Sequence, residues 1–143
     1  MKEQALLEKS RTMHMLLQKA AGDTADFTST AKQLREMLGC SVYLMDKTGG
    51  VLGYDDSGDV NVFSQQALTD KQIDSGDLQW LLSYSQTETG LERNGSHVML
   101  APVTNLGERL GTVVCCRNGS SFGGEDVLLA EYGAAITSVQ PCG

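Results

Sequence analysis

Both ends of the chain carry apolar residues at the spacing of amphipathic helices. Residues 3–20 and 28–38 show this pattern, with an apolar residue returning every three or four positions. The stretch GGEDVLLAEYGAAITSVQ near the C-terminus predicts a longer helix, whose first turn holds Glu125 and Asp126. Negative charge at that place favours a helix, because it faces the positive end of the helix dipole.

The sequence CSVYLMDKTGGVLGYDD alternates apolar side chains between two faces, which predicts a β-hairpin. Val42 and Leu44 should point to one face and Tyr43 and Met45 to the other, with the turn at residues 47–50. Since both faces are apolar, the first strand is expected to be central and covered on both sides.

The middle of the chain is more polar and its pattern is weaker. Residues 55–77 predict short helices or loops, DLQWLLSY a helical turn or two, and SQTETGLERNG a loop by composition. Two further strands are predicted at SHVMLAPVTN, where Pro102 favours an edge or a bulge, and at residues 110–117. Cys115 and Cys116 lie side by side in the last strand, so their side chains should point to opposite faces.

The predicted order is helix, helix, strand, strand, a mixed middle, strand, strand, helix. Strands that cluster as hairpins, rather than alternate with helices, indicate an antiparallel sheet with helices packed on it. We therefore predict an α+β fold in which the N- and C-terminal helices pack together. The length of 143 residues fits a single domain over residues 1–143.

Composition narrows the classes of function. The net charge is −7 and no basic patch is visible, so this chain is not expected to bind nucleic acid directly. No apolar run reaches the roughly 18 residues of a membrane span, and the N-terminus lacks the apolar core of a signal peptide. These features predict a cytoplasmic protein that does not bind membranes.

Motifs for catalysis or metal binding are missing from the sequence. The four cysteines form no CxxC pair, and the simplest interpretation is buried thiols in a reducing compartment. His14 and His97 have no second ligand at metal-binding spacing. No P-loop, GxSxG or HExxH appears, so we predict no catalytic residue, no metal and no cofactor.

Four stretches carry a resemblance to a known family: LLEKSRTMHMLLQKAAG, VLGY, GERLGT and EDVLLAEYGAAI. They closely resemble the N-terminal region of the CodY family, the pleiotropic transcriptional regulators of low-GC Gram-positive bacteria. The resemblance implies a GAF domain that senses branched-chain amino acids, with GTP as a second reported effector of the family. It also implies that DNA is bound by a separate C-terminal winged helix-turn-helix, which this chain does not contain.

The middle segment departs from the family. Residues 55–106 form a shorter stretch than the family has, and they match it poorly. Phe63 stands where the family uses an arginine to pair the carboxylate of the amino acid, and loss of that pair should weaken amino-acid binding. Tyr43 corresponds to an apolar pocket residue of the family and still suits an apolar ligand.

The candidate ligand site is a pocket between the first strand, the middle segment and the strand at His97. Tyr43, Met45, Phe63 and Ile73 are its predicted apolar wall, and Arg93 is the predicted replacement for the missing carboxylate partner. There is a simpler alternative for each: the four wall residues are ordinary core residues, and Arg93 is a solvated cation in a loop. For Arg109, in GERLGT, we predict a surface charge in a hairpin.

Three functions remain open at this point. The first is a sensor domain of a CodY-like regulator, which binds a small effector such as an apolar amino acid, acts as a homodimer and controls a DNA-binding region outside this chain. The second is a degenerate GAF domain that only dimerises. The third is a cysteine-dependent reductase of free methionine sulfoxide, an activity that some GAF domains have.

Overall fold

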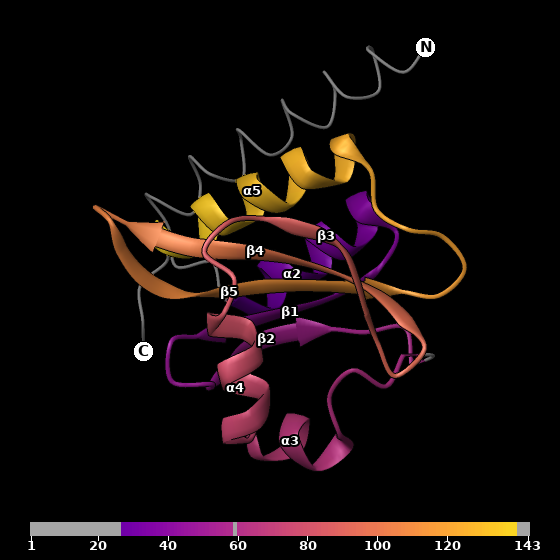
Figure 1. Ribbon diagram of the computed structural model, residues 1–143, viewed down its shortest axis with the longest axis horizontal. Coiled ribbons are helices and arrows are strands. Elements are labelled where there is room, and N and C mark those ends of the chain that lie inside the picture. The colour runs from indigo at the N-terminus through magenta and orange to yellow at the C-terminus, as the bar shows by residue number, and fades with distance from the viewer. Residues whose placement is uncertain (1–26, 59, 140–143) are drawn as a thin grey trace.

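A five-stranded antiparallel sheet forms the centre of the protein, with strand order β2-β1-β5-β4-β3 (Figure 1). The computed structural model describes residues 27–58 and 60–139. The strands are β1 (Ser41–Asp46), β2 (Val51–Asp55), β3 (Glu88–Arg93), β4 (Ser96–Asn105) and β5 (Glu108–Arg117). The helices are α2 (Phe27–Leu38), α3 (Gln65–Asp70), α4 (Ser75–Leu82) and α5 (Gly124–Val139). The predicted α+β antiparallel class is confirmed, while the helix predicted over residues 3–20 lies outside the described residues.

Strand β1 is central, as its two apolar faces predicted. It lies between β2 and β5, and its residues 41–45 are all buried. Val42 and Leu44 belong to the apolar core on one face of the sheet, and Tyr43 and Met45 to the core on the other. The turn that joins β1 to β2 spans residues 47–50, also as predicted.

Two apolar cores therefore lie on opposite faces of the sheet. The first core packs the sheet against α2 and α5, and the second packs it against α3, α4 and the irregular segment before them (Figure 1). Residues 56–58 and 60–87, which connect β2 to β3 and carry α3 and α4, are called the cover below. Cys115 faces the first core and Cys116 the second, which confirms their predicted opposite orientation.

The prediction of a loop over SQTETGLERNG is wrong, because Glu88–Arg93 form strand β3. This strand pairs with β4 through a two-residue turn at Asn94 and Gly95, which have φ values of 52° and 84°. Asn-Gly is the preferred sequence for a turn with two positive φ angles. The strand itself is polar and half-exposed, so its composition resembles that of a loop.

Pro102 lies where β4 has no partner on its outer side. Strand β3 pairs with β4 only as far as Leu100, so beyond that residue β4 is an edge of the sheet, as the proline suggested. On its inner side β4 remains paired with β5 over its whole length. None of the helices in the described part of the chain combines the length and the apolar character of a membrane span.

Candidate functional site

Four of the five candidate site residues come together in the second core, beneath the cover. Tyr43, Met45, Phe63 and Ile73 are all buried there, with at most 4% of each side chain exposed. The Tyr43 ring meets the Phe63 ring edge-on, with 5.2 Å between the centroids. This packing agrees with the simpler alternative of a core, and a ligand-binding role for the four residues stays a prediction.

Tyr43 is a polar side chain in an apolar surrounding. Its hydroxyl donates a hydrogen bond to Asp56 Oδ2 at 3.2 Å, and its ring stacks on Tyr54 with 5.8 Å between the centroids. Burial raises the pKa of Tyr43 strongly, and the nearby Cys116 and Asp56 raise it further. Because Asp56 is the first residue of the cover, this hydrogen bond ties the cover to β1.

Arg93 lies apart from the other four candidates. Tyr43 and Val114 are paired, as are Val114 and Leu100 in the middle of β4, whereas Arg93 pairs with Ser96 at the beginning of β4. Three strand spacings and four residue steps separate Arg93 from Tyr43, about 14 Å across the sheet and about 13 Å along it. The backbones of these two residues are therefore well separated on the sheet.

The side chain of Arg93 instead holds α4. It forms an ion pair with Asp77 and lies over the Trp80 ring, 4.2 Å from its centroid. Burial raises the pKa of Asp77, and the positive charge of Arg93 counteracts that shift. The alternative of a solvated loop cation is therefore wrong, while the predicted role of Arg93 as a carboxylate partner stays a prediction.

Arg109 is a half-buried anchor, and the prediction of a surface charge is wrong. Its guanidinium donates to the carbonyl oxygens of Tyr84 at 2.8 Å and Leu81 at 3.3 Å, at the C-terminal end of α4. It also donates to Gly111 O at 2.6 Å and Thr112 Oγ1 at 2.8 Å on β5. Burial lowers the pKa of Arg109, and its positive charge suits the negative end of the α4 dipole.

Away from Arg109, the cover is also attached to the β1–β2 hairpin. Backbone hydrogen bonds of 3.0 Å join Val51 N to Lys71 O and Ile73 N to Gly49 O. The Gln72 side chain adds a bond of 2.8 Å to Thr48 O. The cover is thus fixed by polar contacts at its margins and by apolar contacts at its centre.

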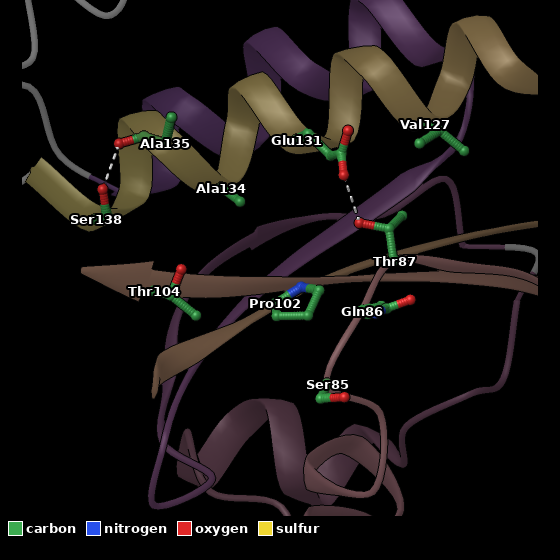
Figure 2. Close-up of a pocket in the computed structure, with 10 residues that line it drawn as sticks. All are labelled: Ser85, Gln86, Thr87, Pro102, Thr104, Val127, Glu131, Ala134, Ala135 and Ser138. Carbon is green, nitrogen blue, oxygen red and sulfur yellow. Dashed lines mark hydrogen bonds between the residues drawn. The ribbon is translucent and has the colours of Figure 1, made fainter. Parts of the chain in front are cut away.

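Two cavities stand out among those that the described residues line. The larger, of about 600 Å³, is a groove between α5, the free edge of β4 and the end of the cover, and Figure 2 shows the Thr87 hydroxyl bonded to Glu131 across it at 3.0 Å. The smaller, of about 360 Å³, lies beside β2. None of the five candidate site residues lines either cavity.

The smaller cavity still approaches the candidate site from outside. Its lining includes Tyr54, whose ring stacks on the Tyr43 ring, and Asp56, which accepts the hydrogen bond of the Tyr43 hydroxyl. Lys71 is its basic lining residue, a position that sequence reasoning did not select. With Asp55 and Asp56 in the same lining, the cavity places charges of both signs close to the margin of the second core.

The three cysteines of the described chain are buried. A hydrogen bond with Cys40 and burial both raise the pKa of Cys115 well above its ordinary value. A thiol of this kind is a poor nucleophile, because the thiolate is the reactive form. In the described part of the chain, no group of three or more potential ligands is placed to hold a metal ion.

Comparison with known proteins points to one family. The model of the CodY GAF-like domain matches residues 5–141. The global transcriptional regulator CodY of Listeria welshimeri is 31% identical, covering 94% of this chain and 58% of its own length. The CodY of Bacillus pumilus is 27% identical and covers 95% of this chain. The chain thus spans somewhat more than half the length of these curated relatives.

Solved structures give the same result. The structure described as the cofactor binding GAF domain of the nutrient sensor CodY from Clostridium difficile superposes with a TM-score of 0.69 at 27% identity, covering 92% of this chain. The chromophore-binding domain of the bacteriophytochrome RpBphP3 from R. palustris has a TM-score of 0.52 at 12% identity. The second similarity concerns the fold alone.

Proposed function

The chain belongs to the family of CodY GAF-like domains, and from this premise we propose that it is the effector-sensing domain of a transcriptional regulator. It binds a small metabolite, for example a branched-chain amino acid, in the cytoplasm as a homodimer. Binding shifts the conformational equilibrium of the domain, and this shift controls the DNA-binding region of the regulator. The proposal has support from the relatives, which are named global transcriptional regulators, and from the solved relative described as cofactor binding.

The observation that carries the proposal is the second core. It buries a tyrosine with its hydroxyl hydrogen-bonded among apolar residues, beneath a segment that contains only two short helices. An apolar effector would enter between this sheet face and the cover, on the side where the cavity beside β2 reaches Tyr54 and Asp56. Lys71 lines this cavity together with Asp55 and Asp56, so its ammonium would attract the effector's carboxylate and the two aspartates the effector's ammonium group.

A thermal-shift panel tests the proposal on the full chain. Leucine, isoleucine, valine, their keto acids and GTP are added separately, and an apolar amino acid or keto acid is expected to raise the melting temperature. At a hundredfold excess over the dissociation constant, bound effector stabilises the fold by about 2.7 kcal/mol. A panel in which no compound shifts the melting temperature would overturn the sensing role.

Two neighbouring valines provide a matched pair for placing the site. Val113 faces the first core and Val114 the second, and both are fully buried. Val113→Ile and Val114→Ile add the same methyl group to opposite faces of the sheet, at a similar cost in packing. Only Val114→Ile is expected to reduce the effector-induced shift. Equal losses in both variants would place the effector elsewhere.

A second candidate is a domain that binds no effector and only dimerises. It draws support from the close packing of the candidate wall residues in the second core. The same panel separates the two candidates. A silent panel together with a dimeric mass by light scattering would favour dimerisation alone.

A further inference from the structure

Arg109 connects the end of α4 to strand β5, two elements that are distant in the sequence. Its guanidinium bonds to the end of α4 at Leu81 and Tyr84, and to β5 at Gly111 and Thr112, just after the turn that joins β4 to β5. Four hydrogen bonds use most of the five donors that a guanidinium offers. No other residue type joins carbonyl groups in such different directions with one rigid plane of donors.

The backbone around Arg109 is held in place as well. A Cβ atom on Gly111 would lie 2.0 Å from Met45 O, so β5 approaches β1 more closely there than a side chain would allow. Leu106 and Gly107 form the tight turn at the tip of the β4–β5 hairpin. The anchor of Arg109 is therefore a rigid part of the sheet, and α4 is the part that it positions.

We propose that Arg109 is a positioning residue for effector binding, which couples the cover at α4 to the β4–β5 hairpin. The inference rests on the proposed function. Because α4 covers the second core, an effector that displaces α4 must stretch or break its bonds to Arg109. The hairpin tip lies at the same end of the molecule as the C-terminal end of α5 (Figure 1), so the coupling runs from the effector site toward the place where the described chain ends.

Arg117 offers a matched control. It is also a half-buried arginine of β5, and it donates to the backbone carbonyls of Leu38, Ser120 and Ser121. These partners lie at the end of α2 and in the loop before α5, away from the cover. Replacement of either arginine by lysine keeps the charge and removes the fork of donors.

Hydrogen exchange on the full chain tests the coupling. In Arg109→Lys, amides of residues 78–87 are expected to exchange about tenfold faster, while those of α2 and α5 keep their rates. Arg117→Lys should instead accelerate exchange in residues 118–123 and leave residues 78–87 unchanged. Unchanged rates over residues 78–87 in Arg109→Lys, or the same increase in both variants, would overturn the proposal.

Effector affinity is the readout that a purely structural role would not move. The compound that shifts the melting temperature of the wild type should bind Arg109→Lys about tenfold more weakly and Arg117→Lys with unchanged affinity. Equal affinity in all three proteins overturns the coupling and leaves the sensor intact. If Arg109→Lys exchanges faster over residues 78–87 but no effector binds the wild type, the proposed function is overturned, and Arg109 still holds α4 in place.

Thr112→Val is the milder variant, in case Arg109→Lys does not fold. It removes one acceptor of Arg109 and preserves the shape of a buried side chain. Exchange over residues 78–87 is expected to rise by a smaller factor than in Arg109→Lys. No change in this variant, with Arg109→Lys unfolded, would count against the coupling.

Discussion

Leu106 occupies, in the β4–β5 turn, the position that Asn94 occupies in the β3–β4 turn. Both residues have a φ of 52°, and both are followed by a glycine with positive φ. Asparagine tolerates this left-handed conformation, whereas it costs other residues about 1–2 kcal/mol. Leu106 is also fully exposed, so no packing compensates for the strain.

Leu106→Asn is therefore expected to stabilise the protein by about 1 kcal/mol, a rise of a few degrees in melting temperature. Differential scanning calorimetry measures the change. The reverse substitution, Asn94→Leu, should lose at least as much, because it also removes the bond of 2.7 Å from Asn94 Nδ2 to Asn61 O. A lower melting temperature in Leu106→Asn would contradict the strain argument.

Gly111 is expected to tolerate no side chain. In Gly111→Ala the new methyl group meets the backbone of β1 at Met45, which cannot move away without separating β1 from β5. The expected loss is about 3 kcal/mol or more in urea unfolding. Gly90→Ala is the control, since nothing lies within 4 Å of a Cβ there. It should be neutral or slightly stabilising, and similar losses in the two variants would contradict the explanation.

The sheet could be predicted where one local pattern determines it. In β1 the alternation of Val42 and Leu44 with Tyr43 and Met45 fixes which side chains share a face, because side chains of a strand alternate strictly. Strand β3 has no such pattern, since only Leu91 among its six residues is a large apolar residue. The Asn-Gly turn was the one local signal for this strand.

The two arginines show why much of the site could not be predicted. Arg93 finds Asp77 and Trp80 sixteen and thirteen residues away, and Arg109 reaches Leu81 and Tyr84 across a whole hairpin. Such contacts depend on how the cover folds back on the sheet, and no periodicity in the sequence encodes that arrangement. An arginine in a polar stretch looks the same whether it meets water or a carbonyl group.

Thiol labelling tests the enzyme alternative. In a Cys142→Ser background, the remaining cysteines are Cys40, Cys115 and Cys116, all buried. Native protein is expected to react with a disulfide reagent only as fast as the fold opens, and all three thiols should react at once in urea. The same protein should not reduce free methionine sulfoxide. Rapid native labelling of Cys115 would contradict its raised pKa and reopen the reductase hypothesis.

The buried Tyr43 hydroxyl should contribute to stability in a way that depends on pH. Tyr43→Phe keeps the ring contacts with Phe63 and Tyr54 but removes the hydrogen bond to Asp56. At neutral pH this is expected to cost about 1 kcal/mol. The cost should depend on pH, because the pKa of Tyr43 is raised in the folded protein relative to the value of about 10 in the unfolded chain.

A raised pKa means that folding favours the protonated phenol. The stabilisation by Tyr43 is then fully present below about pH 10, and it is lost as the pH rises further, because the unfolded chain releases the proton more readily. The difference in free energy of unfolding between the wild type and Tyr43→Phe should shrink above pH 10 and then change sign. Urea unfolding of both proteins between pH 7 and 11 measures it, and the comparison cancels the titration of the other tyrosines and lysines. A constant difference across that range would mean that the Tyr43 hydroxyl reaches water, and hence that the cover is open over this part of the sheet.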